Sequence, residues 1–405
     1  MRLSDWPGFS RLRFDTELKS ARSLMSLFLD SAERAKTSGK KVVAKGPLAP
    51  VEPIYASGAL AYDLYTHEAV HALMKDDFNL TGEAINAGLS PDFNPWNLVA
   101  LGAVVSRRNE LPADTYSTAV GCWHDQIQQS WQLMAQDTGM PLHFWEVPRF
   151  DAESAEWAIE YLIKELKQWF DWLAIRTGQK ITERSLKESI RSGNLLRQDI
   201  MEITQMLQLS KVPISALEYY LAQTLISDYA QDPEMLHDRY QALIQELKDR
   251  VSKAVAAPGL MSEKPLRIYF MGEETLEFRV WNAIEDYGGV LVGCDTRLAL
   301  YYEPIKEDGS AIEDLARWVW RMPYNLSTAD RLKATIPHIK QQKPDAIIIS
   351  SVVGSKNVSE VSRFTRDMIR DELGLPVLCL QTALPLENTE PTDHQIRAFI
   401  EMNAG

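Results

Sequence analysis

The chain has 405 residues, of which 45% are hydrophobic and 24% charged, a composition typical of a globular protein with more than one domain. Its 43 Lys and Arg against 56 Asp and Glu give a net charge of −13, which argues against a general nucleic-acid-binding surface. Apolar runs such as residues 346–349 are short, and residues 1–14 lack a secretion-signal pattern, so we expect no membrane span and no export. Three cysteines fit a reducing cytoplasm better than a disulfide scaffold.

The pattern of apolar residues divides the chain into four regions. Residues 1–40 form a predicted helical lead-in, and 41–150 a first α/β domain that opens with a strand over 41–44. Residues 151–262 predict a helical bridge, and 263–405 a second α/β domain. Helices of the bridge are expected over 152–174, 181–208, 213–229 and 234–255. Strands of the second domain are expected over 266–271, 289–293, 345–350 and 376–381, and its helices over 275–287, 310–320, 328–342, 358–373 and 392–403.

One six-residue segment occurs twice. Ser117-Thr-Ala-Val-Gly-Cys122 is similar to Ser350-Ser-Val-Val-Gly-Ser355, and each follows a Pro and an Asp that open a strand. Each also precedes a Gly-x-Pro that starts the next strand, at Gly139 and Gly374. The repeat predicts an α/β fold of two Rossmann-like, doubly wound parallel domains that arose by duplication and are joined by the helical bridge. Ligands of such sheets bind beyond the carboxyl ends of the strands, which makes Cys122 and Ser355 candidate site residues.

A literal H-E-x-x-H motif lies at His67-Glu68-Ala69-Val70-His71, the spacing with which a helix can bind zinc. The downstream Gly and His that supply a third ligand in many zinc proteases are absent. A surface or edge helix with two histidines is the preferred interpretation, and a zinc hydrolase remains an alternative.

The cysteines and one carboxylate are the other candidates. Cys122, which precedes Trp123 and His124, fits a nucleophile, a metal ligand or a core thiol. Cys379 lies in an apolar strand and is expected to fill the core, whereas Cys294 is ambiguous. Glu52, between Pro50 and Pro53, could act as an acid or base if it is desolvated. On sequence alone, a charge at the start of a helix is the better explanation of Glu52.

Five segments in order resemble one family, the 2-hydroxyacyl-CoA dehydratases and benzoyl-CoA reductases, and in particular their cluster-bearing heterodimer subunits. The resemblance covers roughly residues 40–400 and depends on segments 50–58, 117–122, 139–148, 278–293, and 347–355 followed by 374–378.

In this family a [4Fe-4S] cluster is generally held by three cysteines from three loops. The resemblance places Cys122 at one ligand position, but Asn94 and Ser355 at the other two. Amide and hydroxyl groups are poor iron ligands because the cluster requires soft thiolates. The resemblance therefore implies a [4Fe-4S] cluster in the partner subunit rather than in this chain.

The resemblance also implies a function. The chain is expected to be one subunit of a hetero-oligomer, with a homologous cluster-bearing subunit as partner. An ATP-dependent iron–sulfur activator then supplies single electrons, and an acyl- or aryl-CoA thioester reacts through a ketyl radical, by dehydration or ring reduction. Glu52 is the expected acid/base, and the expected substrate-lining residues are Ser350, Ser351, Ser355, Tyr324 and Asn325. A cluster-free paralogue that only stabilises its partner, or that has another CoA-linked or binding role, remains an alternative.

Overall fold

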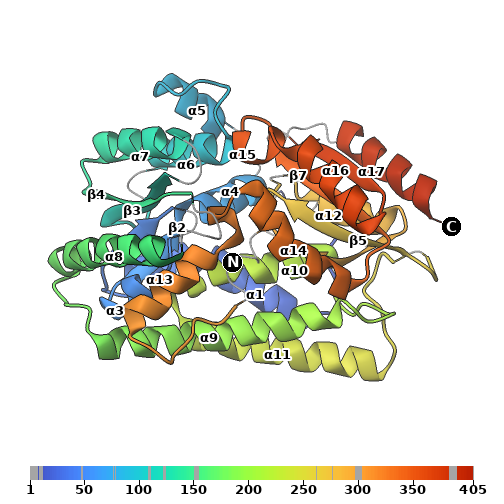
Figure 1. Cartoon of the computed structure of the whole chain (residues 1–405), viewed down its shortest axis with the longest axis horizontal. Helices are drawn as coiled ribbons and strands as arrows, with labels where there is room; N and C mark the ends of the chain where they lie inside the picture. Colours follow the sequence, from blue (N-terminus) through green and yellow to red (C-terminus); the bar gives the residue numbers. More distant parts are fainter. Residues whose placement is uncertain are drawn as a thin grey trace.

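Two four-stranded sheets, each entirely parallel, form the centre of the structure (Figure 1). The computed structural model describes residues 8, 12–46, 49–75, 77, 79–107, 111–121, 125–149, 155–260, 262–275, 277–296, 303–382 and 390–404. The first sheet has the order β2-β1-β3-β4, with β1 at Val42–Lys45, β2 at Leu60–Asp63, β3 at Thr115–Gly121 and β4 at Leu142–Val147. The second has the order β6-β5-β7-β8, with β5 at Leu266–Gly272, β6 at Gly289–Cys294, β7 at Ala346–Val352 and β8 at Val377–Thr382. The predicted fold class is confirmed.

The two sheets have the same strand order, and the register of their central strand pairs corresponds. β3 and β7, which carry the duplicated segment, occupy the same place in the two sheets. The register pairs Lys45 with Ser117 in the first sheet and Gly272 with Ser350 in the second. Each serine is the first residue of the duplicated segment.

The residues around the repeated segment also correspond. Asp114 accepts a hydrogen bond from the Val42 amide at 2.9 Å, and Asp345 accepts one from the Arg267 amide at 3.0 Å. The Asp that opens each repeat therefore joins its strand to the central neighbour. The glycines of the Gly-x-Pro segments, at φ +69° and +67°, end the preceding helices in the left-handed conformation that favours glycine.

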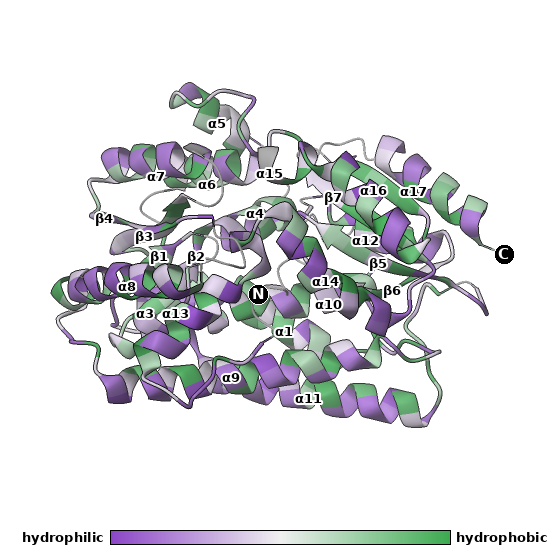
Figure 2. Ribbon diagram, in the orientation of Figure 1, coloured by the Kyte–Doolittle hydropathy of each residue, from purple (hydrophilic) through white to green (hydrophobic). Residues whose placement is uncertain are grey.

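Helices cover both sheets and supply the apolar faces that bury them (Figure 2). All seven residues of β7 are buried, as expected for a parallel strand with a layer on each face. The helices before and around the first sheet are α1 Lys19–Leu29, α2 Ser31–Thr37, α3 Glu52–Ala56, α4 Leu64–Lys75, α5 Leu80–Asn86, α6 Pro95–Arg107 and α7 Asp125–Thr138. Those around the second sheet are α12 Arg279–Asp286, α13 Ala311–Arg321, η6 Pro323–Asn325, α14 Thr328–Gln342, α15 Lys356–Ser359, α16 Ser362–Leu373 and α17 Glu390–Asn403.

The bridge is helical, as predicted, and its helices pack against both halves. Its elements are α8 Ala155–Thr177, α9 Glu183–Met206, α10 Ala216–Thr224, η3 Leu225–Ser227, η4 Tyr229–Gln231 and α11 Pro233–Ser252. α9 and α11 lie side by side along one edge of the molecule, and α13 from the second half packs against α8 and α9 (Figure 1). The boundaries of the four regions, at residues 40, 150 and 262, stay a prediction.

Two predicted helices are interrupted. The helix expected over 358–373 is divided into α15 and α16. The helix expected over 213–229 ends at Thr224, and the chain then makes a turn with three successive left-handed residues, Tyr229, Ala230 and Gln231, at φ +56°, +48° and +62°. Such a turn is unfavourable for residues other than glycine and needs compensating contacts.

Asp228 supplies those contacts. Its Oδ1 accepts a hydrogen bond from the Ala230 amide at 3.0 Å, and its Oδ2 accepts from the Gln231 side chain at 2.9 Å. The same Oδ2 accepts from the Asp63 amide at 2.9 Å and from His67 Nε2 at 2.6 Å. Asp228 therefore fastens the bridge to the end of β2 and to α4.

The first histidine of the H-E-x-x-H motif is part of the contact between the bridge and α4. His67 is fully buried and lies between the rings of Phe28 and Tyr62, with ring centroids 4.3 and 4.4 Å away. Its Nε2 bonds to Asp228 and its Nδ1 lies 3.0 Å from Ser31 Oγ, so both ring nitrogens already have protein partners. His67 consequently has no free nitrogen to offer a zinc ion.

We predict that Asp228→Ala lowers the free energy of unfolding by about 3–5 kcal/mol, because it leaves several buried donors without their acceptor. Chemical denaturation monitored by circular dichroism measures the loss. Asp232→Ala is the matched control: Asp232 caps α11 by accepting from the Met235 amide, and its loss should cost about 1 kcal/mol. Equal losses in the two variants would contradict the role given to Asp228.

Candidate functional site

Asn94 and Ser355 stand at the two expected cluster-ligand positions that lack a cysteine. In the structure both side chains hydrogen-bond one carboxyl group, that of Glu273. Asn94 precedes α6, Glu273 follows β5, and Ser355 follows β7. Asn94 Nδ2 donates to Glu273 Oε1 at 2.9 Å, and Ser355 also hydrogen-bonds the Glu273 side chain. This site joins loops from both sheets at their carboxyl ends, where parallel sheets usually bind ligands.

The Asn94 side chain is fixed in place because it makes a second hydrogen bond. Its Oδ1 accepts a hydrogen bond from the Trp96 amide at 2.9 Å, so Asn94 caps α6, whose first residue is Pro95. The amide nitrogen of the same side chain is thereby aimed at Glu273. The local sequence Asn-Pro-Trp is typical of such a cap but does not indicate the contact with Glu273.

The loops of the two sheets touch closely on the other side of this cluster. Gly354 has φ +84°, and a Cβ atom there would lie 2.8 Å from the carbonyl oxygens of Asp92 and Phe93. Gln126 adds a bridge, accepting from the Asn94 amide at 2.8 Å and donating to the Gly354 carbonyl at 3.3 Å. Only glycine fits at this contact, which sets the spacing between the sheets.

These donors do not fit a [4Fe-4S] cluster. Asn94 and Ser355 present an amide and a hydroxyl, and Cys122 lies outside the described residues. Cys294 ends β6 and bonds to Thr296, and burial raises its pKa to about 12, whereas Cys379 lies on β8. Among the residues that the structure describes, no group of three or more His, Cys, Asp or Glu side chains is arranged to hold a metal ion.

Glu273 was not predicted from the sequence, and its electrostatics make it the most distinctive group of the cleft. Burial raises the pKa of Glu273 to about 7, against the opposing effect of hydrogen bonds from Ser355, Asn94 and the Val352 amide and of the Arg331 charge. The side chain is half-buried, so solvent or a ligand can reach it. A carboxyl with a pKa near neutrality can both give and take a proton.

The other predicted lining residues lie in two groups. Ser350 is paired with Gly272, its carbonyl accepts from the Glu273 amide at 2.8 Å, and its buried hydroxyl makes no hydrogen bond to a described residue. Tyr324 donates its hydroxyl to the Gly272 carbonyl. These two residues therefore adjoin Glu273.

Ser351 and Asn325 make contacts within the second half. The Ser351 carbonyl accepts a hydrogen bond at 3.4 Å from the hydroxyl of Thr382, on the neighbouring strand β8. Asn325 donates to the Val319 carbonyl at 2.6 Å and so closes the end of α13. These contacts indicate a structural contribution for both residues, and their predicted part in substrate binding stays a prediction.

Glu52 lies at the start of α3 and is fully buried. Its Oε1 accepts from Arg197 Nη2 at 2.5 Å and from the Tyr229 hydroxyl at 2.7 Å, both from the bridge. Gly193 in α9 makes room for this contact, since a Cβ there would lie 2.8 Å from Glu52 Oε1. The carboxylate is thus an ion-pair partner that ties α3 to α9.

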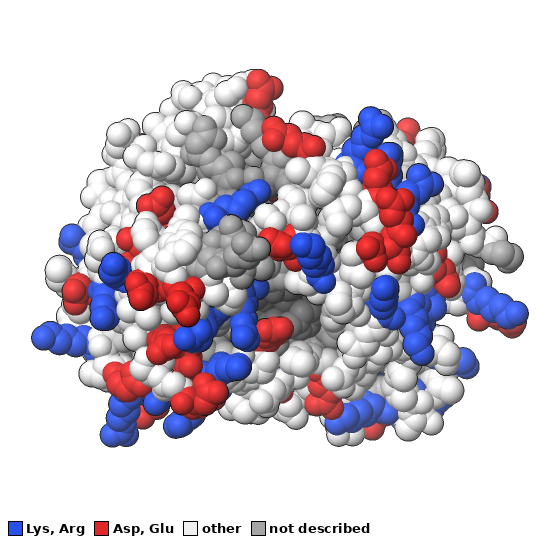
Figure 3. Space-filling view, viewed as in Figure 1, with Lys and Arg blue, Asp and Glu red and all other residues white. Residues whose placement is uncertain are grey.

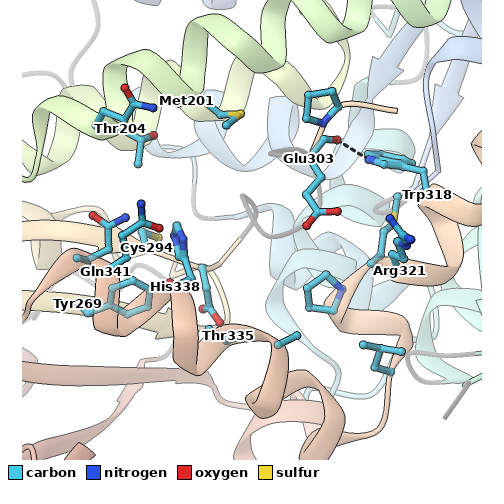
Figure 4. A pocket seen from close by; sticks show the side chains of 18 of the residues that line it. Met201, Thr204, Tyr269, Cys294, Glu303, Trp318, Arg321, Thr335, His338 and Gln341 are labelled. Atoms are coloured by element: carbon cyan, nitrogen blue, oxygen red, sulfur yellow. Dashed lines mark hydrogen bonds between the residues drawn. The ribbon is translucent and has the colours of Figure 1, made fainter. Parts of the chain in front are cut away.

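A cavity of about 570 Å³ lies between α9 and the second sheet (Figure 4). Arg197 packs against one wall of the cavity, because its guanidinium carbon lies 4.7 Å from the ring centroid of Trp318, which lines the cavity. Burial lowers the pKa of His338, on the wall from α14, against the opposing effect of the Asp295 charge, and so favours the neutral ring. The lining residues are Met201, Thr204, Gln205, Gln208, Tyr269, Cys294, Asp295, Glu303, Pro304, Trp318, Trp320, Arg321, Met322, Pro323, Leu326, Ala334, Thr335, His338, Gln341 and Gln342.

Asp295, Arg331 and Tyr324 connect the wall of this cavity to the cluster around Glu273. Asp295 lines the cavity and bonds to Arg331 at 3.3 Å and to the Gly272 amide at 2.9 Å. The Arg331 guanidinium carbon in turn lies 3.7 Å from the ring centroid of Tyr324. A small void of about 40 Å³ on the far side is lined by Gly272, Tyr324 and Arg331, and Leu326 lines both spaces.

Comparison with known protein families supports the resemblance. A family model described as 2-hydroxyglutaryl-CoA dehydratase, D-component, matches residues 48–403. No curated protein matches the chain. Among the described residues, no helix is both long and apolar enough to span a bilayer.

We predict that the Glu273 carboxyl titrates near pH 7 and that Asn94→Ala moves this titration to higher pH. The amide of Asn94 stabilises the ionised form, so its loss must raise the pKa. Carbon-13 NMR of labelled glutamate carboxyls, with Glu273→Gln to assign the signal, measures the effect. Glu218 and Glu285, whose pKa values burial also raises to about 7, are internal controls that Asn94→Ala should leave unchanged. A Glu273 signal that titrates at the ordinary carboxyl pKa would disprove the assignment.

Proposed function

The chain belongs to the 2-hydroxyglutaryl-CoA dehydratase D-component family, and on that premise we propose that it is the cluster-free subunit of a hetero-oligomeric enzyme acting on an acyl- or aryl-CoA thioester. In this proposal a homologous partner subunit holds the [4Fe-4S] cluster, and an ATP-dependent iron–sulfur activator delivers single electrons to the complex. The observation that supports it is the Asn94–Glu273–Ser355 cluster, in which two expected ligand positions are committed to a carboxyl group.

In this proposal the residues of this chain transfer a proton and orient the reacting groups by hydrogen bonds. Glu273 holds a proton at its carboxyl near neutral pH, and Asn94 and Ser355 fix the orientation of that group. Ser350 and Tyr324 adjoin this carboxyl group, since the Ser350 carbonyl accepts from the Glu273 amide and the Tyr324 hydroxyl donates to the Gly272 carbonyl. Glu52, the acid/base expected from the sequence, would act in this proposal through Arg197, whose position it fixes.

A second function is compatible with the same cluster. A paralogue that only stabilises its partner, or that binds a CoA ester for another purpose, would also have lost the thiolates. Catalytic turnover of the complex distinguishes the two functions. Glu273→Gln should abolish turnover if Glu273 transfers a proton, and should leave it unchanged if the chain only stabilises its partner.

We predict that the chain purified alone without oxygen contains no iron or acid-labile sulfide, and that iron appears when it is produced together with its homologous partner. The expected content is about four irons and four sulfides per complex if the partner holds one cluster. Metal and sulfide analysis measures both.

Cys122→Ser provides the control, because a cluster held by the partner should survive it unchanged. About four irons on the lone chain, lost in Cys122→Ser, would overturn the proposal and make this chain the cluster-bearing subunit. Stoichiometric zinc on the lone chain would equally contradict it.

A further inference from the structure

The guanidinium group of Arg331, in α14, has a buried donor that lacks an acceptor. The Arg331 side chain is 13% exposed, and its guanidinium carbon lies 3.7 Å from the ring centroid of Tyr324. Its Nη2 donates to Asp295 at 3.3 Å, but its buried Nε forms no hydrogen bond with any described residue. A cationic donor that is removed from water without an acceptor is costly, so a ligand that accepts from Nε would be stabilised here.

The void of about 40 Å³ beside Tyr324 lies against this guanidinium group. A space of this size has room for about three water molecules, which is roughly the size of an acetate ion. Arg331 lines it from the second half, and Arg149, which follows β4, lines it from the first half. The void therefore lies at a junction of the two halves, with a cation from each.

The polar lining of the void suits an anion. Among the described residues, the charged side chains that line it are Arg149 and Arg331, and no Asp or Glu does. Thr328 and Thr365 add hydroxyl groups. Thr328 is also the first residue of α14, a helix of 15 residues whose dipole favours negative charge at this end. Two guanidinium groups and a helix start thus surround one small space.

The rest of the molecule does not attract anions in general. The chain has a net charge of −13, and basic and acidic side chains are interspersed on the face shown in Figure 3. Asp295 bonds to Arg331 from the wall of the larger cavity, and Asp330, in the first turn of α14, is paired with Lys333. Anion binding at the void therefore depends on its own two arginines.

The remaining lining of the void is apolar and includes Met271, Leu332 and Ile349. A carboxylate with a short alkyl group matches both kinds of wall, because its oxygens accept from a guanidinium group and its alkyl group contacts hydrocarbon. A phosphate ion would place oxygens against the apolar wall, where they lose their hydration. We propose that the void is a binding site for a short-chain monocarboxylate such as acetate, with its oxygens between Arg331 and Arg149. This binding is independent of the proposed function, since it involves no thioester, cluster or partner subunit.

A carboxylate bound at Arg331 would change the protonation of Glu273. Burial raises the pKa of Glu273 to about 7, and the Arg331 charge opposes this increase. The negative charge of the ligand offsets that of Arg331, so Glu273 should keep its proton to higher pH when the void is occupied. The monocarboxylate would thereby act on the cleft without entering it.

Thermal unfolding of the full chain, with sodium chloride replaced stepwise by sodium acetate at constant ionic strength, tests the proposal. Acetate should raise the unfolding midpoint until the site is saturated, because a ligand that binds the folded state stabilises it. Arg149→Gln removes one of the two cations and should weaken acetate binding by about tenfold. Arg363→Gln is the matched control: Arg363 is an exposed arginine on α16 outside the void, and its loss should leave acetate binding unchanged.

Carbon-13 NMR of labelled glutamate carboxyls gives a local measurement. Acetate should move the titration of Glu273 to higher pH and leave those of Glu218 and Glu285 unchanged. Thr365→Val provides a second variant if Arg149→Gln does not fold, since it removes a hydroxyl at nearly constant volume and should weaken acetate several-fold. A midpoint and a Glu273 signal that do not respond to acetate, or that respond equally in both variants, would overturn the proposal. Tighter binding of phosphate than of acetate would also overturn it, because the void would then select an inorganic oxyanion.

Discussion

The carboxylate of Asp228 is the contact on which the arrangement of the molecule depends. It is fully buried and accepts hydrogen bonds from the end of β2, from His67 in α4 and from the turn that it begins. The Asp228 carbonyl also accepts from the Tyr55 hydroxyl at 2.6 Å, which adds α3 to the junction. Tyr229, the next residue, reaches Glu52. The energetic cost of the left-handed turn is thus offset by contacts that attach the bridge to the first sheet.

The bridge, once attached, positions one wall of the cavity. Arg197 in α9 is held by Glu52 from one side and packs on Trp318 from the other. The same helix supplies Met201 and Gln205 to the cavity. A buried ion pair of this kind adds little net stability but leaves a costly unpaired charge if it is broken. Its value here is positional, because it determines where the wall of the cavity lies relative to the first sheet.

The fold could be predicted from the sequence to a large extent, and the site much less. The apolar run of β7 and the repeated serine segment can be recognised from the local sequence alone, without knowing which distant residues they contact. Glu273 lies in Gly-Glu-Glu-Thr, which resembles an ordinary polar turn, and its significance comes from Asn94, 179 residues away in the sequence. The cavity was missed for the same reason, since α9 and α14 are distant in the chain. His67 shows the converse: the spacing matches a zinc motif, but Asp228 already bonds to the ring nitrogen that zinc would need.

The duplication shows why Glu273 is the residue to examine first. In the first half the Gly46 amide donates to the Ser117 carbonyl at 3.0 Å, and in the second half the Glu273 amide donates to the Ser350 carbonyl at 2.8 Å. The two residues are therefore structural equivalents at the end of the central strand. Gly46 is closely packed, with an added Cβ meeting Thr118, so a side chain is excluded there. The backbone of this position is accordingly the same in both halves, and the carboxyl group is a chemical addition to one of them. Neither the strand nor its register requires that group, and its contacts with Asn94 and Ser355 are the feature on which the proposed function depends.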